Sequence, residues 1–408
     1  MELLPTALGT RPRLAVEIKP EGVVAARAED AQALVSAIAY SVLAQGTVTP
    51  QLKAGNFPGR AASVAAVRKA LEAVALKERQ TTLILPDASV RVLLLEFDAL
   101  PAKAVEALPI VRFRLKKLLP FDADDAVISY QIMSTQRGLI RVLAVAVSRD
   151  VLAEYEGVVR EAGFEPGAVI SSTLAACSGL AEDVSATLLV NAGETAVTTA
   201  IVQAGVLLLH RTVDLAAQGL HETAELAASS AATVLTIPQE LLALPLVDVE
   251  SSAGEWAMQE PLTGYGVVDD DRISAQAAMQ ARQLADEIAA EASGEMEQEL
   301  QREAMLPPVS STVEIEAERL AAAAREVTQA VSVAAAYFED TLEMAPGAVL
   351  AAGTLGAETL GHLLREAGFG QDEMRVVEMV DEAMLTGGAS TARIPRGWMA
   401  SVRGALRS

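Results

Sequence analysis

The sequence predicts an α/β protein with two lobes, each of which carries an inserted subdomain. The chain has 408 residues, more than the roughly 250–300 at which a single hydrophobic core stops growing, which favours two lobes. A β-hairpin pattern opens the chain, and a second run of strands begins at residue 187, so the pattern occurs twice. Near the C-terminus a strand, a glycine turn and a helix follow one another at 348–364, as is typical of α/β proteins.

The first lobe begins with the hairpin. Short apolar segments at 14–18 and 23–26 flank Lys19-Pro20-Glu21-Gly22, whose proline and glycine favour a turn. Alanine, valine and leucine then recur at helical spacing in 30–45 and 61–78. We therefore expect two helices there.

A strand pair, a helix and a second strand pair follow and predict a small inserted subdomain. The strands are expected at 81–85, 90–97, 126–133 and 139–147, and the helix at 102–119, before Pro120. The chain then returns to the first lobe. The elements expected there are a helix at 150–162, a strand around Val169 and a helix at 172–180.

The second lobe opens with three strands, expected at 187–191, 196–202 and 206–213. The chain then becomes strongly acidic and rich in Glu, Gln and Ala up to the proline pair at 307–308. Beyond it the expected elements are a helix at 313–342, a strand at 348–352, a helix through Leu364 and a strand at 376–379.

These elements predict four parts. They are the first-lobe core at 1–80 and 147–186, the small inserted α+β subdomain at 81–146, the second-lobe core at 187–215 and 311–408, and an acidic, mostly helical outer subdomain of the second lobe at 216–310. In the acidic segment at 246–310, the alanine-rich sequence favours order, whereas the excess of Asp and Glu favours mobility.

Composition excludes several classes of function. A net charge of −22 opposes the phosphates of nucleic acids, so we expect no nucleic-acid partner. The single cysteine, Cys177, cannot form an internal disulfide, and the three histidines lack metal-ligand spacing, so we expect a reducing compartment and no metal site. Neither a signal peptide nor an apolar run of roughly 20 residues occurs, which predicts a cytoplasmic protein.

Several short motifs follow one another along the chain. They are Leu85-Pro86-Asp87, Leu115-Lys116-Lys117-Leu118-Leu119-Pro120-Phe121-Asp122, Ile128-Ser129-Tyr130-Gln131, Glu161-Ala162-Gly163-Phe164-Glu165-Pro166 and Leu188-Leu189-Val190-Asn191-Ala192-Gly193. In this order they resemble the type IV pilus assembly protein PilM family. The resemblance covers nearly the whole chain and fades in 246–310. It implies a two-lobed actin-like fold, which belongs to the ribonuclease H-like class.

The resemblance to PilM also implies a function. Members of that family are scaffolds that bind the cytoplasmic N-terminal peptide of a PilN-like membrane protein and join a ring with other pilus assembly proteins. We therefore expect a homo-oligomer or ring, held peripherally at the inner membrane through its partner, without catalytic residues. Alternatives in the same fold are an active ATPase or kinase, a related type II secretion component and an actin-like divisome anchor.

The first nucleotide-binding motif departs from the pattern of this superfamily, in which two hairpin turns hold the phosphates of ATP through backbone N–H groups. The usual sequence is Asp-Ile-Gly-Ser-Ser, but the matching residues here are Glu17-Ile18-Lys19-Pro20-Glu21. Pro20 has no N–H to donate, Lys19 lacks the small size of glycine, and Glu21 adds negative charge. These changes argue against a working ATPase.

The second turn, Asn191-Ala192-Gly193-Glu194-Thr195, keeps the glycine, but Asn191 replaces an aspartate that helps to hold magnesium in relatives. The adenosine-contacting motif retains one glycine of two, in Gly353-Thr354. The resemblance thus suggests a degenerate nucleotide site made of Glu17, Asn191, Gly193, Thr195, Gly353 and Thr354. ATP with Mg²⁺ stays open as a cofactor. These glycines can equally serve tight turns alone.

Candidate partner-binding residues lie in the inserted subdomain. Arg112 and Lys116 are four positions apart, so they share one helix face in an otherwise acidic protein. The apolar candidates beside them are Phe97, Leu118, Phe121 and Tyr130. The alternative is that the basic residues pair with the aspartates at 122–125 and that the apolar ones belong to a core.

Overall fold

The computed structural model describes residues 12–29, 35–136, 138–180, 185–215, 309–369, 374–380, 394 and 396–407. Except for the start of one long helix, these residues belong to one compact unit, formed by 1–235 and 321–408. The expectations for the acidic residues 216–308 lie outside the described residues. None of the helices in the described ranges is both long and apolar enough to cross a membrane.

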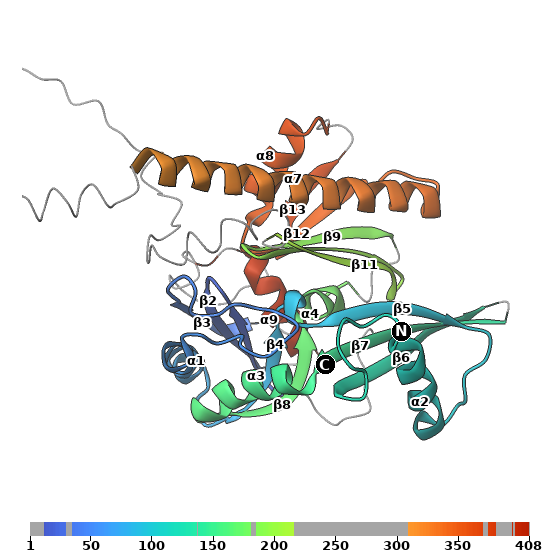
Figure 1. Cartoon of the computed structure of the whole chain (residues 1–408), viewed down its shortest axis with the longest axis horizontal. Helices are drawn as coiled ribbons and strands as arrows, with labels where there is room; N and C mark the ends of the chain where they lie inside the picture. The colour runs from blue at the N-terminus through green and yellow to red at the C-terminus, as the bar shows by residue number, and fades with distance from the viewer. Residues whose placement is uncertain are drawn as a thin grey trace, which may run out of the picture. The chain divides into compact units, whose positions relative to one another are not determined.

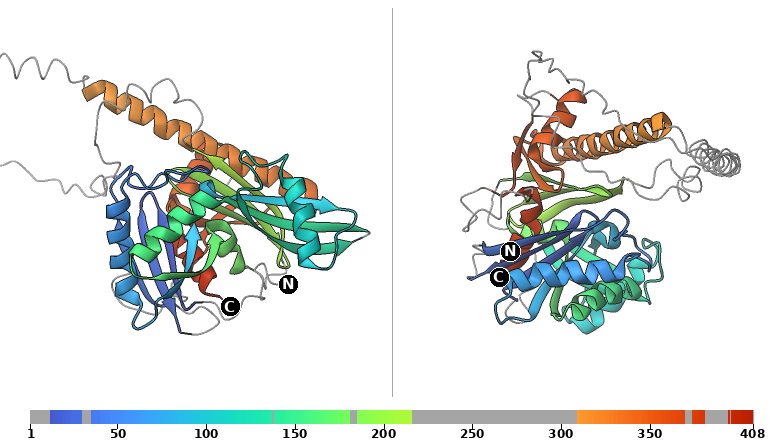
Figure 2. Two further views of the ribbon diagram at one scale, coloured as in Figure 1. Left: turned by 60° about the horizontal axis from the view of Figure 1, so that its bottom comes forward. Right: turned by 90° about the vertical axis from the view of Figure 1, so that its left-hand side faces the viewer.

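The first lobe is built on a five-stranded sheet in the order β3-β2-β1-β4-β8. Strands β1, β2 and β3 pair antiparallel, while β4 and β8 run parallel to β1. Helices α1 and α3 pack their buried apolar residues against one face of the sheet (Figures 1 and 2). The bounds are β1 Leu14–Lys19, β2 Gly22–Ala28, β3 Val35–Val42, α1 Arg60–Val74, β4 Gln80–Leu85, α3 Arg149–Glu161 and β8 Glu165–Ser171.

The helix expected at 30–45 is wrong over its described part, because residues 35–42 form strand β3. The alanines fit a helical pattern, but Val35, Ile38, Tyr40 and Val42 are β-branched or aromatic residues that favour strands. Pairing with β2 along its whole length satisfies the backbone of β3. Tertiary pairing thus overrides the helical propensity of the alanines.

The small subdomain, defined here as residues 91–148, is a three-stranded antiparallel sheet in the order β5-β7-β6, with α2 packed on one face. Val111 and Leu115 of α2 are fully buried against Val142 and Ala144 of β7. A short 3-10 helix, η2 Asp87–Ser89, joins β4 to this sheet. The bounds are β5 Arg91–Phe97, α2 Ala104–Leu115, β6 Ala126–Gln136 and β7 Leu139–Ser148.

The second lobe repeats the topology of the first. Its sheet has the order β11-β10-β9-β12-β13, with three antiparallel strands followed by two parallel ones. Helices α7 and α8 cover one face (Figure 1). The prediction of a two-lobed α/β fold is therefore confirmed. The bounds are β9 Thr187–Ala192, β10 Ala196–Gln203, β11 Val206–Asp214, α7 Val309–Leu342, β12 Ala348–Gly353, α8 Gly356–Glu366 and β13 Arg375–Glu378.

Two helices, α4 Ser172–Ser178 and α9 Met399–Leu406, lie between the two five-stranded sheets (Figures 1 and 2). One hydrophobic cluster contains residues of both sheets and of both helices, so the cores of the two lobes are continuous. Trp398, in η6 Arg396–Trp398 just before α9, is 1% exposed and meets Tyr40 of β3 edge to face. This packing sets how closely the loops of one lobe approach those of the other.

Candidate functional site

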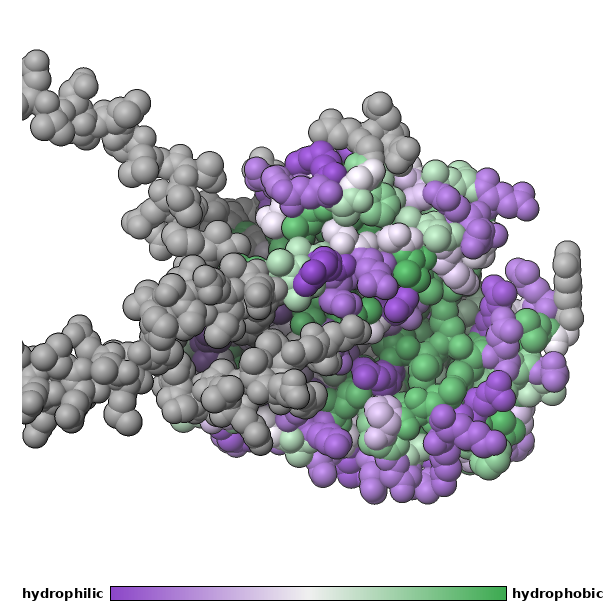
Figure 3. Space-filling view, turned by 45° about the horizontal axis from the view of Figure 1, so that its top comes forward, coloured by the Kyte–Doolittle hydropathy of each residue, from purple (hydrophilic) through white to green (hydrophobic). Residues whose placement is uncertain are grey.

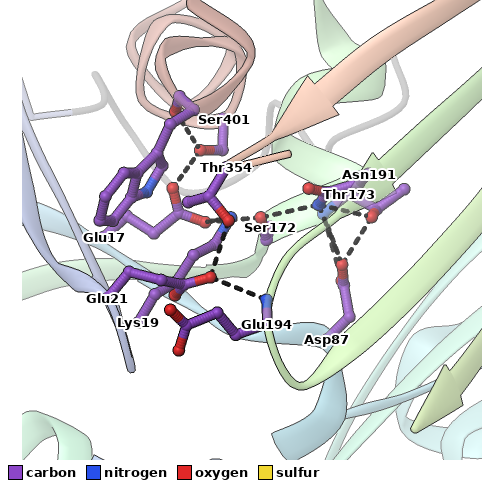
Figure 4. Close-up of polar contacts among 11 residues, drawn as sticks. Glu17, Lys19, Glu21, Asp87, Ser172, Thr173, Asn191, Glu194, Thr354 and Ser401 are labelled. Carbon is purple, nitrogen blue, oxygen red and sulfur yellow. Dashed lines mark hydrogen bonds and ion pairs between the residues drawn. The ribbon is translucent and has the colours of Figure 1, made fainter. Parts of the chain in front are cut away.

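The two hairpin turns named in the sequence meet at the junction of the lobes. Residues 20–21 connect β1 to β2, and residues 193–195 connect β9 to β10. Thr354, which follows β12, lies beside them (Figure 4). The structure thus brings together six sequence-predicted residues, which are Glu17, Asn191, Gly193, Thr195, Gly353 and Thr354.

Glu17 is fully buried, and its carboxylate is already bound by neighbouring side chains. Ser172 Oγ donates to Glu17 Oε1 at 2.5 Å, and Ser401 Oγ donates to Glu17 Oε2. Lys19 Nζ lies 3.1 Å from Glu17 Oε1 and 5.8 Å from the centroid of the Trp398 ring. Because the negative charge is paired and hydrogen-bonded, its burial is tolerated, and both side chains are already engaged with protein partners.

The side-chain amide of Asn191 is hydrogen-bonded to other residues of the protein. Its Nδ2 lies 2.9 Å from the hydroxyls of Ser172 and Thr173 and 3.2 Å from Asp87 Oδ2. Asp87 also accepts hydrogen bonds from the backbone N–H and the hydroxyl of Thr173. The position expected to help hold magnesium is therefore part of an internal polar network that joins both lobes (Figure 4).

Sequence reasoning missed Asp87, Ser172, Thr173 and Ser401 as members of this network. A signal existed for three of them. Asp87 was recognised only as part of a family motif, and Ser172 and Thr173 are hydroxyl residues at the start of a helix that directly follows a strand. Ser401 carries no local signal, because it reaches Glu17 across 384 positions of sequence.

Glu21 reaches from the first lobe to the second. Its Oε1 accepts a hydrogen bond from the backbone N–H of Glu194 at 2.9 Å and from Thr354 Oγ1 at 2.7 Å. A Cβ at Gly193 would stand 3.1 Å from the same oxygen, so the absent side chain makes room for the carboxylate. Glu21 Oε2 is sealed from solvent and has no hydrogen-bond partner among the described residues.

The space between these turns does not fit ATP. The cavity has a volume of about 30 Å³, which is room for about one water molecule. Sites that bury small ligands usually have volumes of roughly 300–1,000 Å³. Glu21 brings a carboxylate to the turns that would hold the phosphates, and Pro20 has no N–H to offer them. The residues present therefore do not match the nucleotide that the fold suggests.

A metal or nucleophile site is not evident in the ranges that the structure describes. No group of three or more His, Cys, Asp or Glu side chains is placed there to hold a metal ion. Cys177 is buried, and burial raises the pKa of its thiol. The thiol is thus kept neutral, as a small apolar core residue is expected to be.

A larger hollow, which we call the β5 groove, lies where the small subdomain meets β11 and α7. Its volume is about 660 Å³. Figure 3 shows a hydrophobic hollow whose rim carries hydrophilic residues. The apolar lining comprises Leu94, Leu95, Phe113, Leu118, Met133, Leu207, Leu208 and Tyr337, and the charged lining comprises Glu96, Arg114, Lys117 and Arg141.

Large apolar side chains of the groove are open to solvent. Phe113 is 70% exposed and Leu118 is 48% exposed. At the rim, Arg141 pairs with Glu96 at 3.2 Å, whereas Arg114 and Lys117 form no salt bridge with any described residue. The groove therefore combines an apolar floor with positive charge in a strongly acidic protein.

The six predicted partner-binding residues are placed differently from one another. Leu118 lines the β5 groove. Phe97, Phe121 and Tyr130 pack, partly buried, against the core of the small subdomain. The guanidinium of Arg112 donates to the carbonyl oxygens of Ala123 and Ala126, and Lys116 pairs with Asp124 at 2.6 Å. Arg114, two positions beyond Arg112 on α2, and Lys117, just after the helix, line the β5 groove instead.

Comparison with known proteins shows a likeness in fold. No protein-family model and no curated protein sequence matches the chain. A solved PilM–PilN type IV pilus biogenesis complex matches with 14% identity over 97% of this chain and 98% of the other, at a TM-score of 0.58. This match shows the actin-like fold that the resemblance implied.

Two further solved structures are less similar. The cytoplasmic domain of EpsL, an inner-membrane component of the type II secretion system of Vibrio cholerae, has 16% identity over 53% of this chain and 74% of the other, at a TM-score of 0.33. The ethanolamine utilization protein EutJ from Carboxydothermus hydrogenoformans has 10% identity over 98% and 91%, at a TM-score of 0.39.

Proposed function

We propose that this protein is a scaffold of a type IV pilus or related secretion machine and binds a cytoplasmic peptide of a PilN-like membrane protein in the β5 groove. The observation that carries the proposal is the likeness, along nearly the full length of both chains, to a chain of a solved PilM–PilN complex. The groove supplies a surface suited to such a peptide. No catalytic residue is needed for this role.

The shape of the β5 groove favours an extended peptide. Leu94 and Leu95 are neighbours on a strand, so their side chains point to opposite faces of the sheet, yet both line the groove. The groove therefore follows the outer edge of β5. Among the described strands β5 pairs with β7 alone, so its other edge can accept a peptide strand through backbone hydrogen bonds.

The charges favour an acidic peptide with apolar anchors. The chain as a whole carries a net charge of −22 and repels acidic partners at long range, but Arg114 and Lys117 present local positive charge at the groove. Phe113 and Leu118 offer exposed apolar area beside them. We propose that the occupant of the β5 groove is the N-terminal cytoplasmic segment of a PilN-like protein, with acidic residues flanking apolar ones.

In this proposal the partner holds the chain at the cytoplasmic face of the inner membrane, where copies of it join a ring with other pilus assembly proteins. An active ATPase or kinase is the less supported alternative, because such an enzyme would need room for a nucleotide where Glu21 joins the lobes. A type II secretion or divisome component would differ in the peptide that it binds.

Fluorescence anisotropy with a labelled N-terminal peptide of the PilN-like protein encoded in the same genome tests the proposal. We expect the wild-type protein to bind, and we expect Phe113→Glu to weaken binding by about tenfold or more, because it places a charge on the apolar floor. Arg114→Glu should also weaken binding, most strongly at low salt.

Val105→Glu is the matched control. Val105 lies on the same helix and is 86% exposed, but it does not line the groove. Its variant should bind like the wild type. Absence of binding by the wild-type protein would contradict the proposed function, and equal affinities of the Phe113 and Val105 variants would contradict the choice of groove.

A further inference from the structure

The contacts of Glu21 differ from what the fold leads one to expect. The carboxylate of Glu21, in the first hairpin turn, is held by the second hairpin turn and by Thr354, where the fold would place the phosphates of a nucleotide (Figure 4). The donors, Glu194 N–H and Thr354 Oγ1, both belong to the second lobe, whereas the acceptor belongs to the first. Gly193 leaves the space that the carboxylate enters.

We propose that the loops of the second lobe at residues 193–195 and 354 form an oxyanion-binding site, which the chain fills with the carboxylate of Glu21. A backbone N–H and a hydroxyl that point at one oxygen bind carboxylate and phosphate oxygens alike. The site is therefore filled without a soluble anion, and the carboxylate that fills it links the two lobes.

The surroundings of Glu21 hold it in this position. Pro20 restricts the backbone of the two-residue turn, and Lys19 at its start is 7% exposed and paired with Glu17. Tyr40 donates its hydroxyl to the backbone oxygen of Glu21 at 3.1 Å. Burial raises the pKa of Tyr40, and the charges of Glu21 and Glu194 raise it further, so Tyr40 stays protonated and able to donate.

The surroundings of Glu21 offer little to a soluble anion. Lys19 is committed to Glu17, so a free phosphate would gain no unpaired cation there. It would also meet the carboxylate of Asp87, which lines the same cavity. The carboxylate of Glu21 meets the same negative charge, but it is tethered to the neighbouring strand and loses less freedom on binding than a soluble anion does.

The consequence is a junction that stays closed without nucleotide. In an actin-like fold that binds ATP, the phosphates bridge the loops of both lobes. Here Glu21 makes that bridge permanently, across 333 positions of sequence to Thr354. This inference does not rest on the proposed peptide binding, which concerns the β5 groove.

Hydrogen exchange of the full-length protein tests the oxyanion site. We expect Glu21→Ala to raise the exchange rate of the Glu194 amide by about tenfold or more, because the amide loses a charge-assisted hydrogen bond. Sodium acetate or inorganic phosphate at high concentration should restore protection in this variant. Sodium chloride at the same ionic strength should not.

Two further variants keep the test decisive. Thr354→Val removes the other donor and leaves Glu21 in place, so it should also speed exchange at Glu194, and it covers the case in which Glu21→Ala does not fold. Glu72→Ala removes an exposed carboxylate of α1 and should change nothing at Glu194.

Either of two results would overturn the inference. One is unchanged exchange at Glu194 in both Glu21→Ala and Thr354→Val. The other is faster exchange in Glu21→Ala that acetate and phosphate restore no better than chloride does. Peptide affinity for the β5 groove is measured separately, so failure here is distinguishable from failure of the proposed function.

Discussion

Asp87 shows how a single buried residue links distant parts of the chain. Its carboxylate accepts hydrogen bonds from Thr173, at the start of α4, and from Asn191, at the end of β9. Leaving a buried carboxylate without such donors costs several kcal/mol, more than most single contacts contribute. The network therefore stabilises one arrangement of the η2 segment, α4 and β9.

His210 of β11 is a partly buried titratable group outside this network. Its Nε2 is sealed from solvent and has no hydrogen-bond partner among the described residues. Burial lowers the pKa of His210, although the negative charge of Asp87 acts in the opposite direction. The folded protein therefore disfavours the protonated imidazole more than the unfolded chain does.

We predict a pH-dependent loss of stability from this lowered pKa. Above the unfolded value of about 6.5 the imidazole is neutral in both states, so the stabilisation is fully present. As the pH falls from 6.5 through the folded pKa, the unfolded chain binds a proton that the folded protein does not. The free energy of unfolding then decreases, by at most about 1.4 kcal/mol per pH unit for this one group.

Urea unfolding of the wild type and His210→Gln between pH 5 and pH 8 measures this contribution. The difference between the two should depend on pH below about 6.5 and be constant above it. His362→Gln is the control, because the His362 side chain is 63% exposed. Parallel curves for the wild type and His210→Gln would contradict the prediction.

At the scale of elements, one face of helix α2 packs against the core of the small subdomain, and another lines the β5 groove. Ala107, Val111 and Leu115 recur every four residues and are buried against the sheet of the small subdomain. Phe113 and Arg114 of the same helix line the β5 groove. The helix thus both stabilises the subdomain and presents groove residues.

Pro109 lies inside α2 and is exposed. It has no N–H for the helical hydrogen bond, and proline is about 3 kcal/mol less favourable than alanine in a helix interior. We predict that Pro109→Ala raises the free energy of unfolding by about 1–2 kcal/mol, since the greater freedom of the unfolded chain offsets part of the gain. Chemical unfolding, compared with the near-neutral Val105→Ala, checks this prediction. A loss of stability would show that Pro109 has a packing role.

At the scale of the whole molecule, α4 and α9 connect the two lobes. Ser178 Oγ of α4 donates to the carbonyl oxygen of Gly404 in α9 at 2.6 Å. At Gly404 an added Cβ would overlap the carbonyl oxygen of Ala175. The two helices can therefore approach this closely only with glycine at position 404.

We predict that Gly404→Ala loosens the junction of the lobes and lowers the free energy of unfolding by about 1–3 kcal/mol through overpacking. Gly347→Ala is the matched control, because nothing lies within 4 Å of the Cβ that it would add. Urea unfolding followed by circular dichroism measures both variants. Equal stabilities would mean that α4 and α9 shift apart without cost.

Much of the fold could be predicted from the sequence alone. The two lobes, most strands and helices, and the hairpin turns at 20–21 and 193–195 follow from apolar periodicity and from the positions of proline and glycine. The six nucleotide-motif residues were named from their motifs, and the structure brings them together at the lobe junction. That these residues bind a nucleotide stays a prediction, and so do the proposed domain boundaries. These features could be predicted because they depend on residues that are close in the sequence.

Only the tertiary structure decided the rest. β3 is a strand because β2 offers it a partner, and Ser401 and Thr354 reach Glu17 and Glu21 because the lobes pack together. The β5 groove likewise exists only where β5, β11 and α7 meet. Except for the pairing of β2 with β3, such contacts join segments that are far apart in the sequence. Local periodicity cannot predict them, because they form only when buried surfaces and polar groups from distant segments satisfy one another.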